Sequence, residues 1–303
     1  MQESNDKLDL DYIISETEQI NEKHKILRKV IFRLVKGKIS GTTLDSAIKV
    51  IRDLSSKGIN ASVTILNEKV DDTTKARYNT NSYIQLVKQL SRLNLKADIS
   101  LRPSQLGYFL NTKLFEKNIT ELSDTLKKLD YGLWVEQEKN IDTYSIIENF
   151  GFDKMGTEAT YKQINSKIFD SKINNSRVKI IPDSFAYGAG ESGQDLAISK
   201  KIELIKNTSI LASKVYLLEP DEKSILYMQK MQKEVSKNII FEMPYGIGNK
   251  KINKLLKANL NMSIYLPYGK DWSKYAINRL TEGRIRRIAV AVLDRWQGTK
   301  ITK

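Results

Sequence analysis

The sequence predicts an α/β protein: a (β/α)8 TIM-type barrel with an N-terminal helical extension. Short apolar segments alternate with amphipathic, helix-like segments eight times along the chain, which is typical of a parallel sheet. Eight such units in about 250 residues match a closed barrel. No stretch rich in Pro, Gly and Ser interrupts the pattern. We therefore expect the extension over residues 1–40 and one barrel over residues 41–303. A doubly wound open sheet is the alternative.

The elements follow from local signals. In Leu8–Lys38, apolar residues recur at helical spacing with no Pro or Gly before Gly37, which predicts helices in the extension. Thr43 is an N-cap for the first barrel helix, which ends at Gly58. The expected strands are Ala61–Leu66, Ala97–Leu101, Gly132–Glu136, Gly156–Tyr161, Arg177–Ile181, Lys214–Leu218, Asn238–Met243 and Met262–Leu266. The expected later helices are Thr73–Leu93, Leu114–Leu129, Thr143–Asn149, Gln163–Lys172, Gln194–Ile210, Glu222–Val235, Lys250–Asn259 and Asp271–Leu280, with polar turns at Arg102–Gly107 and Pro267–Gly269.

Composition excludes several classes of site. The 303 residues include no cysteine and a single histidine, His24, so we expect no disulfide, no metal site and no Ser-His-Asp triad. No apolar run is long enough to span a bilayer, and the acidic, polar N-terminus is unlike a secretory signal, so a cytoplasmic protein is expected.

The net charge of +14 is spread along the chain, apart from a basic tail at Arg284, Arg286 and Arg287. This tail is a candidate for contact with a membrane surface. Nucleic-acid binding is the weaker reading, because acidic residues are interspersed with the basic ones.

Function in such a barrel is expected where strands end and loops begin. The polar residues at these places are Thr64, Asn67, Glu68, Arg102, Ser104, Gln105, Glu136, Glu138, Glu158, Tyr161, Asp183, Ser184, Glu219, Asp221, Glu242, Tyr245, Tyr265 and Tyr268. This mixture suits a small zwitterion or a polar cofactor. Tyr265 and Arg279 are spaced to meet one small anionic substrate, although a packed tyrosine and a solvated arginine would look the same in sequence.

The segment Gly188-Ala-Gly190-Glu-Ser-Gly193 fits the G-x-G-x-x-G pattern of dinucleotide-binding loops. It lies several residues after the nearest strand, and no strand ending in an acidic residue follows at the usual distance. We interpret it as a loop over the pocket, whose backbone N–H groups are also suited to a phosphate.

Four segments resemble monofunctional bacterial proline dehydrogenases. They are GTTLDSAIKVIRDLSSKGINASVTILNE (41–68), ADISLRPSQLG (97–107), IIFEMPYGIGNKK (239–251) and LLKANLNMSIYLPYGKDWSKYAINRLTE (255–282). The likeness runs in consistent order over about residues 41–282 and is weakest over 156–219. It implies a distorted barrel that binds FAD at the strand ends and oxidises L-proline, or a related secondary amino acid, to the cyclic imine pyrroline-5-carboxylate. Electrons would pass to a quinone.

The resemblance also assigns roles to residues. It places Arg102, Glu136, Tyr265 and Arg279 around the substrate, and Glu158, Glu242, Tyr245, Gly246 and Glu282 around the cofactor. Tyr265 would pack on the substrate ring, and Arg279 would bind its carboxylate.

The chain departs from the family at several of these places. Asn278 replaces the first of two paired arginines, Thr64-Ile65 replaces an Asp-His pair, and Glu242 replaces a glutamine. The family's VKGAY reads Ile181-Pro182-Asp183-Ser184-Phe185, without its lysine, and THDEK reads Glu219-Pro220-Asp221-Glu222-Lys223, without its histidine. A flavin-less relative that binds a metabolite or partner is therefore the alternative function.

Overall fold

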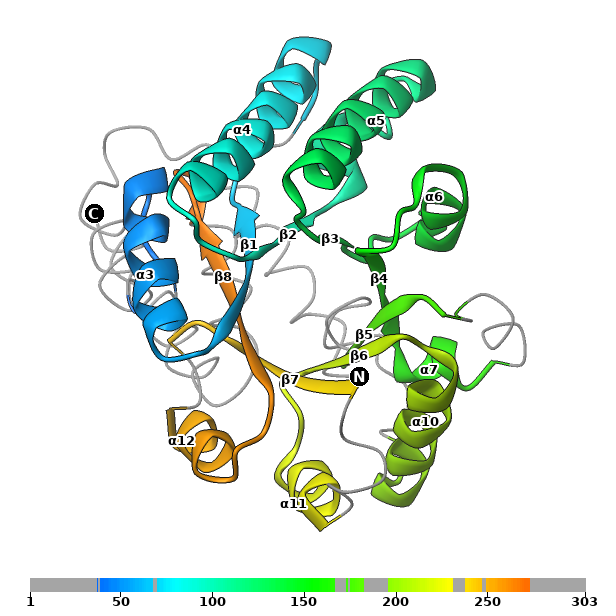
Figure 1. Cartoon of the computed structure of the whole chain (residues 1–303). Coiled ribbons are helices and arrows are strands. Elements are labelled where there is room, and N and C mark those ends of the chain that lie inside the picture. The colour runs from blue at the N-terminus through cyan, green and yellow to red at the C-terminus, as the bar shows by residue number, and fades with distance from the viewer. Residues whose placement is uncertain are drawn as a thin grey trace, which may run out of the picture. The chain divides into compact units, whose positions relative to one another are not determined.

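The computed structural model describes residues 37, 39–67, 70–166, 173, 175–182, 196–230, 238–246 and 249–272. Eight parallel strands form a closed barrel in the order β1-β2-β3-β4-β5-β6-β7-β8, which confirms the predicted (β/α)8 fold (Figure 1). The strands are β1 (Asn60–Ile65), β2 (Asp98–Leu101), β3 (Leu133–Val135), β4 (Met155–Thr160), β5 (Arg177–Ile181), β6 (Lys214–Leu218), β7 (Ile239–Pro244) and β8 (Met262–Tyr268).

Helices surround this barrel in the view of Figure 1, which looks along its axis. Those described are α3 (Leu44–Ser56), α4 (Thr73–Arg92), α5 (Thr112–Leu129), α6 (Thr143–Phe150), α7 (Tyr161–Ile164), α10 (Ile198–Leu211), α11 (Glu222–Lys230) and α12 (Asn249–Lys257). A short 3-10 helix, η2 (Pro103–Leu106), follows β2. None of the described helices has the length and apolar character needed to cross a bilayer.

The barrel closes between its first and last strands. Six consecutive residues of β1 pair with β8 in parallel, from Asn60 opposite Ser263 to Ile65 opposite Tyr268. No other pair of neighbouring strands shares as many aligned positions within the described residues. This pairing of β1 with β8, the seam of the barrel, joins segments about 200 residues apart in sequence. It closes the sheet and thereby fixes the circumference of the barrel.

Helix α3 precedes β1, yet it packs against both β1 and β8. The residues just before α3 are hydrogen-bonded to the carboxyl end of β8. Ser40 N–H donates to the Pro267 carbonyl at 3.0 Å, and Gly269 N–H donates to the Gly41 carbonyl at 3.1 Å. The Thr43 side chain then caps the helix, accepting from Ser46 N–H. An N-terminal helix thus fills the place between the last and first strands.

The apolar core consists of two clusters of buried residues. The large apolar cluster lies between the strands and the surrounding helices and includes Val63, Leu86, Leu122 and Ile205, all completely buried. The second apolar cluster, Trp134, Tyr216 and Ile240, comes from β3, β6 and β7. The side chains that face the barrel axis are otherwise largely polar, in contrast to the branched apolar residues usual inside such barrels.

The expected elements match the structure within a few residues, with four differences. The helix predicted over Gln163–Lys172 is wrong where the structure describes it, because α7 spans Tyr161–Ile164 and ends at its C-cap Asn165. The predicted turn at Pro267–Gly269 is wrong, because β8 continues through Tyr268. The predicted polar turn at Arg102–Gly107 contains the 3-10 helix, which Gly107 ends at φ +92°. Helix α10 begins at Ile198 rather than Gln194.

Several predictions lie outside the described residues. They are the extension over 1–40 apart from residues 37, 39 and 40, the glycine loop Gly188–Gly193, most of the helix Asp271–Leu280, and the basic tail with Arg284, Arg286 and Arg287.

Candidate active site

Contacts between strands that are not neighbours identify the side chains inside the barrel, because only the interior connects such strands. Tyr265 of β8 reaches Glu136 after β3, and Lys179 of β5 reaches Glu242 of β7. Successive side chains of a strand point to opposite faces, so every second residue faces the barrel axis. The inward-facing residues of the eight strands therefore form successive layers along the axis.

The uppermost layer, at the carboxyl ends of the strands, centres on Glu136. One carboxylate oxygen, Oε1, accepts from the Tyr265 hydroxyl at 2.9 Å and from Ser100 Oγ at 2.8 Å. The other oxygen, Oε2, accepts from Arg102 Nε at 3.2 Å. The Glu136 side chain is 7% exposed and that of Arg102 is 56% exposed. A buried carboxylate therefore holds a tyrosine and an arginine side by side at the open end of the barrel.

The backbone around Arg102 is fixed by a second set of hydrogen bonds. Gln105 Oε1 accepts from Arg102 N–H and from the Tyr83 hydroxyl, each at 2.9 Å. Gln105 Nε2 donates to the Ile65 carbonyl at 2.8 Å. The 3-10 helix that places Gln105 begins at Pro103, whose ring presets the backbone angle needed there. Gln105 therefore connects the carboxyl end of β1 to the carboxyl end of β2 next to Arg102.

The next layer centres on Lys179, whose side chain is completely buried. Its ammonium lies 2.7 Å from Glu242 Oε2 and 3.9 Å from Glu158 Oε1. Glu242 is also 0% exposed, and its Oε1 accepts from Ser62 at 2.7 Å and Ser263 at 3.3 Å. Burial alone would lower the pKa of Lys179, but Glu242 and Glu158 together raise it above its ordinary value. Lys179 therefore carries a fixed positive charge.

Glu158 behaves differently from its neighbours. Burial, together with the negative charge of Glu136, raises the pKa of Glu158 to about 7, although Lys179 and the backbone N–H of Gln137 oppose the shift. That N–H donates to Glu158 Oε2 at 3.0 Å. Glu158 thus binds or releases a proton near neutral pH, inside the barrel.

Aromatic rings enclose the lysine. The Lys179 ammonium lies 4.9 Å from the centre of the Trp134 ring and 5.5 Å from that of Tyr265. Both distances are within the range of cation–π attraction. Trp134 also makes an edge contact with Tyr216, 4.6 Å between ring centres. Tyr265 therefore links the Lys179 layer to the Glu136 layer, with its ring on one and its hydroxyl on the other.

The structure places seven of the nine predicted site residues. It brings Arg102, Glu136 and Tyr265 together at the mouth, and Glu158 and Glu242 one layer below, around Lys179. Tyr245 follows β7, where its N–H donates to the Tyr265 carbonyl at 2.9 Å, and its partly buried ring packs against the large core cluster. Gly246 has φ +69°, which favours glycine. Arg279 and Glu282 lie outside the described residues.

Sequence reasoning missed Lys179, Trp134 and the three serines that hold the carboxylates, Ser62, Ser100 and Ser263. The departure at Ile181–Phe185 suggested that the site had lost its lysine, but β5 itself supplies one, from within RVKII. A lysine at the centre of a fully buried strand, between Val178 and Ile180, is rarely tolerated unless it is paired. That signal was present in the sequence and would have identified Lys179.

Comparisons with known proteins agree with the resemblance. The chain is 26% identical over 277 residues to proline dehydrogenase 2 of Bacillus subtilis (strain 168), covering 86% of this chain and 90% of that protein. It is 21% identical over 290 residues to proline dehydrogenase of Deinococcus radiodurans, covering 89% and 91%. No protein-family model matches the chain. The resemblance to proline dehydrogenases is therefore confirmed by relatives that span most of its length.

A solved structure shares the fold. Proline utilization A (PutA) from Bdellovibrio bacteriovorus, inactivated by N-propargylglycine, superposes with a TM-score of 0.67 at 14% identity, over 85% of this chain. The chain corresponds to only 33% of that longer protein. This likeness supports the barrel architecture alone.

Proposed function

We propose that this chain, a homologue of the proline dehydrogenases, is an FAD-dependent oxidoreductase that converts L-proline, or a related secondary amino acid, to its cyclic imine. A quinone-type acceptor would then take the electrons. The observation that carries the proposal is the convergence of Tyr265 and Arg102 on Glu136 at the open end of the barrel. These are three of the positions to which the resemblance assigns substrate contact.

The donors at this end fit a flavin, whose ring carries several hydrogen-bond acceptors. Asn67, just after β1, has a buried Nδ2 without a hydrogen-bond partner within the described residues. Only the Nε of Arg102 is engaged by the residues the structure describes, which leaves its two terminal nitrogens for a ligand. Asn67 and Arg102 would therefore hold the cofactor or the substrate beside it, and a bound flavin would supply the acceptor for the hydride.

The residues of the mouth would position the substrate. Arg102 would bind the carboxylate of the amino acid with its free nitrogens, since charge-assisted contacts of this kind are strong. Tyr265, fixed by Glu136, would form one wall against the substrate ring. The Arg102 guanidinium remains in place during these contacts because Glu136 holds its Nε.

Glu242 and Lys179, one layer deeper, would act through other residues rather than touch the ligand. Glu242 is fully buried and both of its oxygens are engaged, so we assign it to holding Lys179 rather than to contact with the cofactor. Lys179 in turn would supply positive charge beneath the mouth. Glu158, whose pKa is about 7, is suited to take up a proton released when the amine is oxidised.

Flavin binding is tested by the absorption spectrum of the purified protein. The expected protein is yellow, or becomes yellow with added FAD, and loses the oxidised flavin bands when proline is added without oxygen. The variants Tyr265→Phe and Arg102→Ala should slow this bleaching by about tenfold or more. Tyr78→Phe, at a tyrosine that is 66% exposed, is the matched control. A colourless protein that takes up no FAD would refute the proposal.

A metabolite-binding protein without flavin is the second candidate. The interior network favours it, because Lys179 and Glu242 neutralise each other and Glu242 Oε1 already accepts from Ser62 and Ser263. Under this function, FAD would leave the unfolding temperature unchanged while proline alone would raise it. Calorimetric titration with each ligand separates the two candidates.

A further inference from the structure

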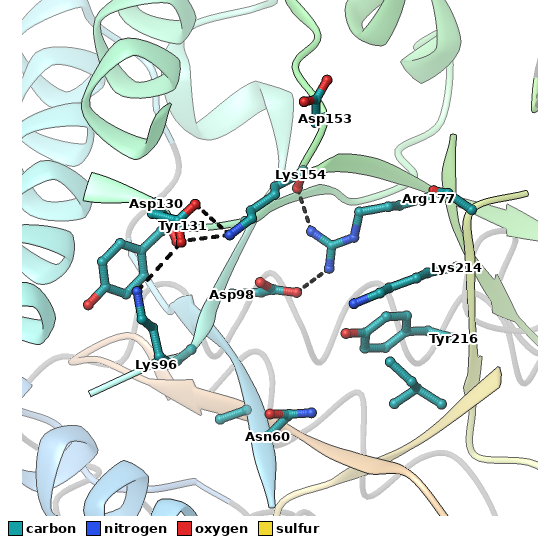
Figure 2. A pocket seen from close by; sticks show the side chains of 15 residues that line it. Asn60, Lys96, Asp98, Asp130, Tyr131, Asp153, Lys154, Arg177, Lys214 and Tyr216 are labelled. Carbon is teal, nitrogen blue, oxygen red and sulfur yellow. Dashed lines mark hydrogen bonds and ion pairs between the residues drawn. The ribbon is translucent and has the colours of Figure 1, made fainter. Parts of the chain in front are cut away.

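The amino end of the barrel contains a cavity of about 500 Å³ (Figure 2). Its lining includes Asn60, Asp98, Arg177 and Lys214, the first residues of β1, β2, β5 and β6. It therefore lies at the opposite end of the strands from Glu136. Sites for small molecules have volumes of roughly 300–1,000 Å³, so the cavity is large enough for one.

Basic side chains from four parts of the chain line this cavity: Lys96, Lys154, Arg177 and Lys214. Lys96 and Lys154 share one carboxylate, Asp130, at 3.8 Å and 2.5 Å. Lys214 makes no ion pair or hydrogen bond with any residue that the structure describes. Two ammonium groups with one counter-ion, and a third with none, leave the rim of the cavity positively charged.

The acidic side chains of the lining neutralise only part of this charge. Asp98 is engaged by Arg177 and also accepts from Trp134 Nε1 at 3.1 Å. Asp130 forms ion pairs with both Lys96 and Lys154. In Figure 2 the carboxylate of Asp153 points away from the other labelled side chains.

Arg177 forms the floor of the cavity. Its side chain is 8% exposed and lies over the Trp134 ring, 4.5 Å from the ring centre. One terminal nitrogen binds Asp98 and the other donates to the Lys154 carbonyl. Its Nε is buried and has no hydrogen-bond partner among the described residues. Buried donors are rarely left in this state, and the acceptor nearest in kind is Tyr216 of the same lining, whose contact with Arg177 helps to raise the pKa of the arginine.

We propose that the amino end of the barrel binds a compact, phosphate-bearing anion, held by Lys214 and Lys154 beside the buried ion pair of Arg177 and Asp98. A phosphate group carries enough oxygens to accept from several ammonium groups at once. A smaller hollow of about 300 Å³ shares Asp130, Tyr131, Asp153 and Lys154 with the cavity. The site therefore has room either for free phosphate or for a phosphate joined to an organic group.

Thermal unfolding of the full chain tests the proposal, with inorganic phosphate, ADP and sodium chloride compared at equal ionic strength. We expect phosphate to raise the unfolding temperature saturably, as a ligand of the native state does, and sodium chloride not to. Stronger stabilisation by ADP would show that the smaller hollow is also occupied, and equal stabilisation would identify free phosphate as the ligand.

Two matched variants show where the anion binds. Lys214→Ala should weaken phosphate binding about tenfold or more, whereas Lys88→Ala, at an exposed lysine of α4, should leave it unchanged. Lys214→Gln serves the same purpose if the alanine variant does not fold. Dependence on Lys214 also separates this site from any binding of ADP at the other end of the barrel.

Equal effects of phosphate and sodium chloride, or identical titrations of the Lys214 and Lys88 variants, would overturn the proposal. Neither outcome bears on flavin or proline, so this site and the proposed oxidation fail or stand independently.

Discussion

The buried pair of Lys179 and Glu242 offers the sharpest test of how the barrel interior is held together. Lys179→Met keeps the volume of the side chain but removes its charge. Glu242, with no exposed surface, would then retain Ser62 and Ser263 as hydrogen-bond donors but lose its counter-ion at 2.7 Å. Breaking a buried ion pair on one side costs about 3–5 kcal/mol of stability. Native domains have about 5–15 kcal/mol in total, so the loss should be large.

The assay is urea denaturation at pH 7 on four proteins: the parent, Lys179→Met, Glu242→Gln and the double variant. Each single variant should unfold at a clearly lower urea concentration than the parent. The double variant removes both charges and should be more stable than the sum of the two losses predicts, with a coupling free energy of about 2–3 kcal/mol.

Strict additivity of the two losses would refute this reasoning, as would a cost below about 1 kcal/mol for Lys179→Met. Either result would mean that water reaches the pair and screens it. A change in the urea dependence of the free energy, rather than in the midpoint, would instead indicate altered compactness of the unfolded or native state, or unfolding that is no longer two-state.

Two further predictions concern neighbours of this pair. Glu158 has a native pKa of about 7 against 4.5 when unfolded, so the native state holds a proton that the unfolded state releases. Its contribution to stability is complete below pH 4.5 and is lost as the pH rises to 7, on the order of 3 kcal/mol, and Glu158→Gln should flatten the unfolding free energy measured across this range. Gly156→Ala would place a methyl carbon 2.6 Å from Trp134 and 2.8 Å from the Arg177 carbonyl oxygen. It should destabilise the barrel by about 1–3 kcal/mol in the same denaturation assay, and a neutral result would mean that β4 can shift away from β5.

The sequence predicted those parts of the fold that depend on neighbouring residues. Strands β5 and β6 have the expected bounds, Arg177–Ile181 and Lys214–Leu218, because each is a short apolar run between polar loops. The capping role of Thr43 was likewise readable, because a cap acts within one turn of its own helix.

What the sequence could not predict depends on contacts across the barrel. Tyr265 and Glu136 are 129 residues apart, and nothing local indicates that the hydroxyl of one meets the carboxylate of the other. The extent of β8 was also missed, because a proline followed by Tyr-Gly reads as a turn. Pro267 lies in the strand nonetheless, opposite Thr64 of β1.

The seam between β1 and β8 also determines when the protein can fold. During synthesis the first strand emerges about 200 residues before its partner, so nascent chains must carry β1 and later β7 with one unpaired edge each. Such edges recruit other chains, and contacts distant in sequence form slowly. Closure of the barrel should therefore wait until Met262–Tyr268 has left the exit tunnel.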